Sequence, residues 1–141
     1  MKREGPKVIN VEMKKKKDFD LLKEDKTSFF FGKDHKDVFL MAMVYGFLNN
    51  SVKPLGEKHS GGHCRVETLN ERDITLIKAV AVKKTGSLDV LLNLKEVYSI
   101  AEQYANGGIS YLKNDVFSKQ HGSYSKKLED LLVELHRKFS L

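Results

Sequence analysis

The stretch of sequence that decides the fold is Val38–Leu48, which reads VFLMAMVYGFL and holds no charged residue. Three consecutive helical turns without a polar face predict a helix that is buried on nearly every side. Asp34 supplies an N-cap side chain, and Asp37 completes a capping box three residues later. Asn49 and Asn50 end the helix, because asparagine tolerates the left-handed conformation found at helix C-termini. We therefore expect the core to be built around this helix.

Three further stretches repeat apolar residues at the spacing of an amphipathic helix. They cover residues 70–86, 93–105 and 125–139, and the last of them has leucines at i, i+3, i+4 and i+7. Gly107 and Gly108 are expected to stop the second of these helices, since glycine commonly follows a helix end. Residues 109–117 would then form a separate short helix or turn.

Two short stretches alternate in the manner of β-strands. Ile9, Val11 and Met13 recur at period two, and residues 64–68 alternate apolar and charged side chains. The length of 141 residues fits one domain. The sequence thus predicts a mainly α-helical, single compact domain of four to five helices, with room for a small two- or three-stranded β element in its N-terminal half.

Positive charge is concentrated at the front of the chain. Residues 1–17 hold seven basic and two acidic side chains and carry a net charge of +5, whereas the whole chain carries +6. The remaining residues are therefore almost neutral. We divide the chain into a basic N-terminal leader, residues 1–17, and a single helical domain, residues 18–141.

The leader ends in four consecutive lysines, Lys14, Lys15, Lys16 and Lys17. Such a run can neutralise phosphates and bind nucleic acid without reading its sequence. No aromatic side chain lies between the lysines to stack on single-stranded bases. The alternative interpretation is a solvated leader that keeps the chain soluble. DNA contact through these four lysines is the nucleic-acid prediction.

A glycine-rich loop holds the residues that come nearest to a metal site. His59, His63 and Cys64 lie within six residues, and His35 or His121 could add a fourth ligand. The spacing matches no zinc pattern with two cysteine pairs, and the ligands lie on a flexible loop. A mobile polar loop beside a small buried cysteine explains the same residues. We expect no metal and no cofactor.

Enzymatic signatures are missing from the sequence. His63 and Cys64 are chain neighbours, so on a strand their side chains point to opposite faces. Neither G-x-x-x-x-G-K-[ST], the pattern of nucleotide-hydrolysing phosphate loops, nor G-x-G-x-x-G, the dinucleotide-binding pattern, occurs. A hydrolase or ribonuclease that uses His59, His63 or His121 is the weakest alternative considered. We expect a protein that is not an enzyme.

Other features bear on partners and location. Phe29, Phe30 and Phe31 cannot all face one side, so either they pack beneath a helix or part of the run forms a partner-binding patch. The uncharged run of 11 residues is too short for a bilayer, which needs about 20. The single cysteine is typical of a reducing compartment, so a cytoplasmic protein is expected. The sequence leaves the oligomeric state open.

Two segments resemble a known family. Residues 37–50, DVFLMAMVYGFLNN, are similar to its "DVF-x-x-A-x-x-x-G" helix, and residues 100–109, IAEQYANGGI, are similar to its "I-x-E-x-Y-A-N-G-G" helix end. The family is DNA phosphorothioation-associated protein 4. The resemblance implies an accessory role in a prokaryotic DNA sulfur modification or restriction system, and it assigns no catalytic residue. The lysine-rich leader departs from the family pattern.

The sequence therefore predicts a non-enzymatic accessory protein of such a system, which binds its protein components, DNA, or both. The alternative is a transcriptional regulator of helix-turn-helix type. In that case the helix over residues 70–84 would present Arg72, Lys83 and Lys84 to DNA. Residues 18–141 carry a net charge of only +1, which is low for a surface that binds duplex DNA.

Overall fold

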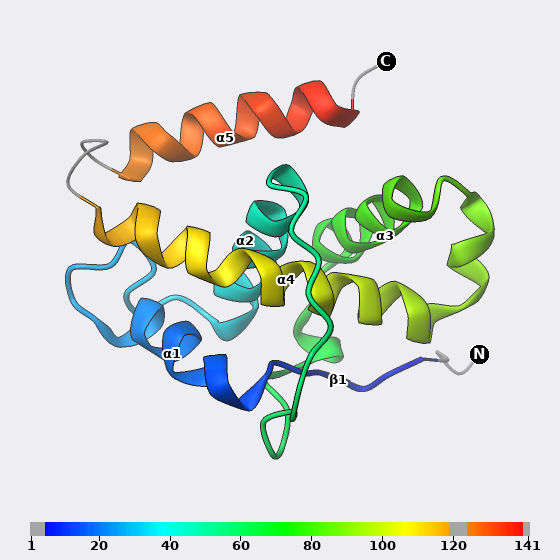
Figure 1. The fold of residues 1–141 in the computed structure, drawn as a ribbon, viewed down its shortest axis with the longest axis horizontal. Helices are drawn as coiled ribbons and strands as arrows, with labels where there is room; N and C mark the ends of the chain where they lie inside the picture. The colour runs from blue at the N-terminus through cyan, green and yellow to red at the C-terminus, as the bar shows by residue number, and fades with distance from the viewer. Residues whose placement is uncertain (1–4, 119–123, 140–141) are drawn as a thin grey trace.

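The computed structural model describes residues 5–118 and 124–139 of the chain. Two long helices, α2 and α4, pack together at the centre, with α1 and α3 on either side of them and α5 lying across one edge (Figure 1). The predicted mainly α-helical fold with a small β element is confirmed. The elements are β1 (Val8–Ile9), η1 (Met13–Lys15), α1 (Lys16–Glu24), α2 (His35–Leu48), β2 (Cys64–Arg65), η2 (Val66–Thr68), α3 (Glu71–Thr85), η3 (Leu88–Leu92), α4 (Leu94–Phe117) and α5 (Tyr124–Phe139).

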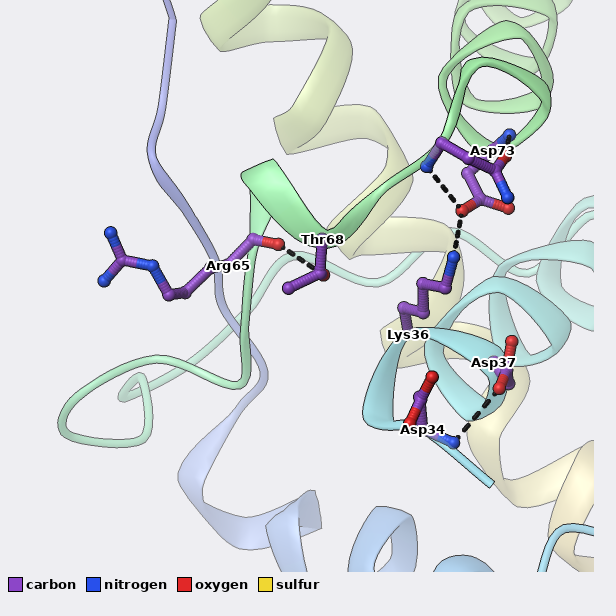
Figure 2. A network of polar contacts seen from close by, with 7 residues as sticks. Asp34, Lys36, Asp37, Arg65, Thr68 and Asp73 are labelled. Carbon is purple, nitrogen blue, oxygen red and sulfur yellow. Dashed lines mark hydrogen bonds and ion pairs between the residues drawn. The ribbon is translucent and has the colours of Figure 1, made fainter. Parts of the chain in front are cut away.

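Helix α2 is the buried central helix that its uncharged sequence predicts. Phe39, Ala42 and Met43 are completely buried, and the side chains on its other faces are also largely covered. The predicted capping box is present, with the Asp34 backbone N–H donating to Asp37 Oδ2 at 3.0 Å (Figure 2). This bond satisfies a donor that the first helical turn leaves without a partner.

Helix α4 differs from the sequence prediction at Gly107 and Gly108. These glycines do not stop the helix, which continues through them to Phe117. A Cβ atom on Gly108 would lie 1.9 Å from the carbonyl oxygen of Ala42, and one on Gly46 would lie 2.0 Å from that of Tyr104. The glycines therefore allow the backbones of α2 and α4 to approach each other closely. The expected separate element over residues 109–117 is the last part of α4.

The β element consists of two short antiparallel strands. Strand β1 pairs with β2, with Val8 opposite Arg65 and Ile9 opposite Cys64. Ile9 is completely buried, so this small sheet ties the front of the chain into the core. Both predicted strands are shorter than their alternating sequences, because each gives way to a 3-10 helix, η1 or η2.

Helix α3 begins and ends where its sequence predicts. The Asn70 side chain accepts the Asp73 N–H at 2.9 Å, and Gly86 follows the helix in the left-handed conformation. Lys36 Nζ lies 2.7 Å from Asp73 Oδ2, which joins the first turn of α2 to that of α3 (Figure 2). In the next segment Ser87 caps η3 and Asn93 caps α4, so both of the capping residues considered are used.

The front of the chain contacts the rest of the protein. Val11 is buried, and α1 begins at Lys16, so the predicted boundary at residue 17 falls inside a helix. The division into a leader and a helical domain stays a prediction. Within residues 5–118 and 124–139, no helix has both the length and the apolar character required to cross a membrane.

Candidate functional site

One face of α4 binds two segments that are distant in sequence. The carboxylate of Glu102 is buried, and its Oε2 accepts the backbone N–H of Asn10 at 2.6 Å. The Asn106 side chain donates to the carbonyl oxygens of Lys53 and Pro54 at 3.1 and 3.2 Å. We call residues 51–58 the strap, the green segment that crosses in front of α4 in Figure 1. Glu102 and Asn106 thus hold the front of the chain and the strap against α4.

The strap and the front of the chain also contact each other. Glu12 Oε1 accepts the Gly56 N–H at 2.6 Å, and the Met13 N–H donates to the Glu57 carbonyl at 2.7 Å. Burial raises the pKa of Glu102, because a charged carboxylate loses its hydration there. The family-like segment over residues 100–109 therefore joins several parts of the fold. Its glycines allow α2 to approach closely, and the side chains of Glu102 and Asn106 form hydrogen bonds with backbone groups of other segments.

His63 lies inside the fold rather than on a mobile loop. It is 7 % exposed, and its ring centroid lies 5.1 Å from that of Phe19 and 4.8 Å from that of His35. Burial, with the nearby Lys16 cation as a further cause, lowers the pKa of His63 to about 3. Lys16 Nζ lies 3.1 Å from His63 Nδ1, which must accept, since an ammonium group has only donors. His63 is a neutral core residue.

Of the residues considered for a metal site, His35 and His63 lie next to each other, with ring centroids 4.8 Å apart. Burial raises the pKa of the Cys64 thiol to about 12, so it stays protonated at neutral pH and is a poor ligand and nucleophile. The His59 backbone N–H donates to the Val11 carbonyl at 2.9 Å. Among residues 5–118 and 124–139, no group of three or more His, Cys, Asp and Glu side chains is arranged to hold a metal ion. His121 lies outside the described residues.

The four lysines predicted to contact DNA divide into two pairs. Lys14 and Lys17 are exposed. Lys15 Nζ donates to the Asn106 carbonyl at 2.8 Å, and Lys16 Nζ lies 3.1 Å from Asp20 Oδ1 as well as contacting His63. Burial, and then the charge of Lys53, lower the pKa of Lys15. Two of the four cations are thus engaged within the protein, and two face solvent.

Helix α5 covers α2 with its leucine face. Leu131 is 7 % exposed, whereas its chain neighbour Leu132 is 53 % exposed. A cavity of about 310 Å³ lies beside this contact, lined mainly by apolar side chains of α2 and α5. Phe30 is buried beneath the start of α5, with its ring centroid 5.9 Å from that of Tyr124, while Phe31 is exposed. The phenylalanine run is therefore partly core and partly surface.

A second apolar hollow lies between α3 and η3, with a volume of about 530 Å³. We call it the η3 groove. It is bordered by Leu88, which is 71 % exposed, and its apolar lining continues onto α5 through Phe139. Leu92, also on η3, is 89 % exposed. The residues that line the η3 groove are Thr75, Lys78, Ala79, Val82, Lys83, Gly86, Leu88, Leu91 and Phe139.

The sequence interpretation missed the η3 groove. The signal was present as LDVLL over residues 88–92, a run too rich in leucine for an ordinary connection. Its local pattern does not say which leucines are covered. In the fold Val90 is buried and Leu88 and Leu92 are not.

Comparison with known proteins gives one result. A family model described as DNA sulphur modification system-associated protein 4 matches residues 10–140. This match confirms the resemblance carried by residues 37–50 and 100–109. No curated protein and no solved structure matches the chain.

Proposed function

The chain belongs to the DNA sulphur modification system-associated protein 4 family and is thus an accessory protein of such a system; we propose that it acts in the cytoplasm by binding other components rather than by catalysis. The partners are protein components of the modification system or its linked restriction machinery, with DNA contacted through surface lysines. The proposal starts from the family and is developed from the arrangement of the polar and apolar side chains.

The observation that carries the proposal is the way the buried titratable groups are used. Glu102 binds the backbone of Asn10, His63 accepts from Lys16, and the Cys64 thiol is kept protonated by burial. A general acid, base or nucleophile must reach a substrate. These groups serve the chain's own fold, and this favours a structural role for them over a catalytic one.

Protein binding is favoured by the exposed leucines. Leu88, Leu92 and Leu132 leave more than half of their side-chain surface uncovered. Burying a leucine in an interface stabilises a complex by roughly 1.5–3 kcal/mol. Two of the three, Leu88 and Leu92, lie on the short η3 element, and Leu88 lines the η3 groove.

DNA contact is proposed for Lys14 and Lys17 in particular. Both side chains are exposed, whereas Lys15 and Lys16 make contacts within the fold. An exposed lysine can neutralise a phosphate at no cost in internal contacts. The run of four lysines therefore supports about two phosphate contacts in this structure.

The helix-turn-helix alternative receives no support from the helix connections. That motif joins two helices through a turn of three to four residues. Here α2 and α3 are separated by residues 49–70, and α3 and α4 by residues 86–93. Arg72, Lys83 and Lys84 on α3 are exposed, but no turn of three to four residues joins α3 to α2 or to α4.

Complementation tests the absence of catalysis. In a strain that lacks the gene, we would measure phosphorothioate content of the DNA by mass spectrometry and protection by the linked restriction system. Glu102→Gln, which keeps an acceptor for Asn10, and Cys64→Ser are expected to restore both readouts to the level of the natural chain. Loss of either readout, with an unchanged circular dichroism spectrum, would contradict the proposal.

A mobility shift on duplex DNA tests the lysines separately. Lys14→Glu with Lys17→Glu is expected to weaken binding and to reduce the salt dependence of log K by about 2, one phosphate for each lysine. The matched control is Lys126→Glu with Lys138→Glu, which makes the same charge change on α5. Equal weakening by both double variants would show that net charge alone matters.

A further inference from the structure

The η3 groove has the chemistry of a docking site for one kind of partner. We propose that it binds an acidic amphipathic helix belonging to another protein of the sulphur modification system. This inference rests on the proposed function, because it names the surface and the partner chemistry through which binding would take place.

The apolar part of the groove supplies the binding surface. Val82 and Ala79 of α3, Leu91 of η3 and Phe139 of α5 line it, and Leu88 borders it with most of its side chain in solvent. Helix α3, the η3 element that follows it and the distant α5 thus present a continuous apolar surface. A hollow of about 530 Å³ accommodates several apolar side chains, as grooves that receive amphipathic helices do.

The charged part of the groove selects the sign of the partner. The charged residues that line it are Lys78 and Lys83, and both are cations. Neither forms an ion pair with any residue in the described ranges 5–118 and 124–139. Asp89, the acidic residue of η3, does not line the groove. Lys83 Nζ lies 5.9 Å from the centroid of the Phe139 ring, over the apolar lining. Carboxylates of a bound helix would therefore meet two ammonium groups that have no acidic partner in the described ranges, at the edge of an apolar surface.

The cavity beside α5 lacks this selectivity. It is also apolar, but its charged lining residues are Lys33 and Asp37, one of each sign. It favours neither an acidic nor a basic partner. Charge complementarity therefore distinguishes the η3 groove from the cavity beside α5.

A second copy of this chain fits the groove poorly. In a two-fold contact each groove would face its own duplicate, so Lys78 and Lys83 of both copies would be brought together. Like charges placed opposite each other in an interface oppose association. An acidic helix from a different protein meets no such repulsion.

Binding would be tested with the full chain and synthetic peptides. Overlapping peptides of about five helical turns, or about 18 residues, would cover the other sulphur modification proteins of the same organism. Fluorescence anisotropy would measure the Kd of each peptide. We expect the bound peptides to carry net negative charge and apolar residues at i, i+3, i+4 and i+7. A set of bound peptides that is neutral or basic would overturn the inference.

Two variants connect binding to the groove. Leu88→Ser removes an exposed leucine and is expected to weaken the Kd by about tenfold or more. Leu132→Ser, an exposed leucine of α5, is the matched control and should leave the Kd unchanged. Lys78→Glu with Lys83→Glu should also weaken the Kd by about tenfold or more, while Lys14→Glu with Lys17→Glu, an equal change of charge, should not. Equal effects of groove and control variants would overturn the inference.

Two further outcomes separate this inference from the proposed function. If the chain copurifies with sulphur modification proteins and Leu88→Ser leaves that association intact, the proposed function stands and the groove is not the docking site. If sedimentation shows a dimer that Leu88→Ser dissociates, a second copy occupies the groove and the inference is wrong.

Discussion

The contact between α2 and α4 and the contact between α2 and α5 hold the same helix in different ways. Where α2 meets α4, backbone lies against backbone, and Gly46 and Gly108 have no space for a single added carbon. Where α2 meets α5, leucine side chains separate the helices and a cavity remains beside them. Side chains can repack around a change, whereas a backbone must move as a unit.

The comparison predicts unequal local stability. Contacts of α4 reach the front of the chain through Glu102 and the strap through Asn106, so α4 is tied to most of the fold. Helix α5 makes far fewer contacts with the remainder. Regions with few buried contacts open first, so α5 is expected to exchange its amide protons sooner than α4 does.

The largest effect is expected at the helix crossing. Gly108→Ala would place a Cβ atom 1.9 Å from the Ala42 carbonyl oxygen and 2.4 Å from the Gly46 nitrogen. Both neighbours are backbone atoms, so the helices must separate. We expect the free energy of unfolding to fall by about 3 kcal/mol or the chain to remain unfolded. Urea denaturation followed by circular dichroism measures this loss.

Gly56→Ala is the matched control for this substitution. Its added Cβ would meet Glu12 Oε1 at 3.0 Å, which is the end of a flexible side chain. The free energy of unfolding should change by less than about 1 kcal/mol. Equal losses from both alanine variants would break the distinction between backbone contact and side-chain contact.

A smaller effect is expected within α5. Leu131→Ala removes a buried leucine and should cost about 2 kcal/mol, at the low end for such a change, because the neighbouring cavity lets the site relax. Leu132→Ala, at the exposed neighbour, should change stability by less than about 0.5 kcal/mol. Hydrogen exchange should show faster opening of α5 in Leu131→Ala. Equally faster exchange in α4 would show that the two contacts form one cooperative unit.

The smallest effect is expected from acid. The pKa of His63 is about 3 in the fold and 6.5 in the unfolded chain, so the unfolded state binds the proton first. Stability from the neutral ring is therefore present above pH 6.5 and is lost as the pH falls towards 3. Between pH 6.5 and pH 5.5 this group alone should remove about 1 kcal/mol. Urea denaturation at each pH measures it.

His63→Gln should flatten that part of the stability profile. Some slope remains in the variant, because burial also lowers the pKa of His35, which packs against His63. The pH effect reports on the packing of His63 between two helices. Lys16 and Phe19, which contact His63, lie on α1, and His35 lies on α2. An unchanged slope would show that the imidazole of His63 is not sealed from protons.

Much of the fold was predictable because it is encoded locally. The apolar run over residues 38–48 leaves a helix no exposed face, and the capping side chains of Asp34 and Asn70 act within four residues of themselves. Such signals can be recognised in the sequence without knowing which other segments each helix contacts in the fold. The ends of α2 and α3 were therefore predicted correctly.

The remaining features depend on residues that are distant in sequence. A pair of glycines carries the same local signal at a helix end and at a helix crossing, so the prediction that Gly107 and Gly108 stop the helix was wrong. The sequence likewise does not distinguish the four consecutive lysines at residues 14–17 from one another. Its division into exposed and engaged side chains arises from contacts that Lys15 and Lys16 make with α4 and with His63.

By itself, then, the amino-acid sequence determined the helical class, the central helix and the family resemblance, since each follows from patterns a few turns long. Tertiary structure alone decided which glycines touch backbone, which lysines stay in water and which leucines border the η3 groove. The physical reason is burial: whether a side chain is covered depends on segments brought against it by folding, and the chain's local order does not contain that information.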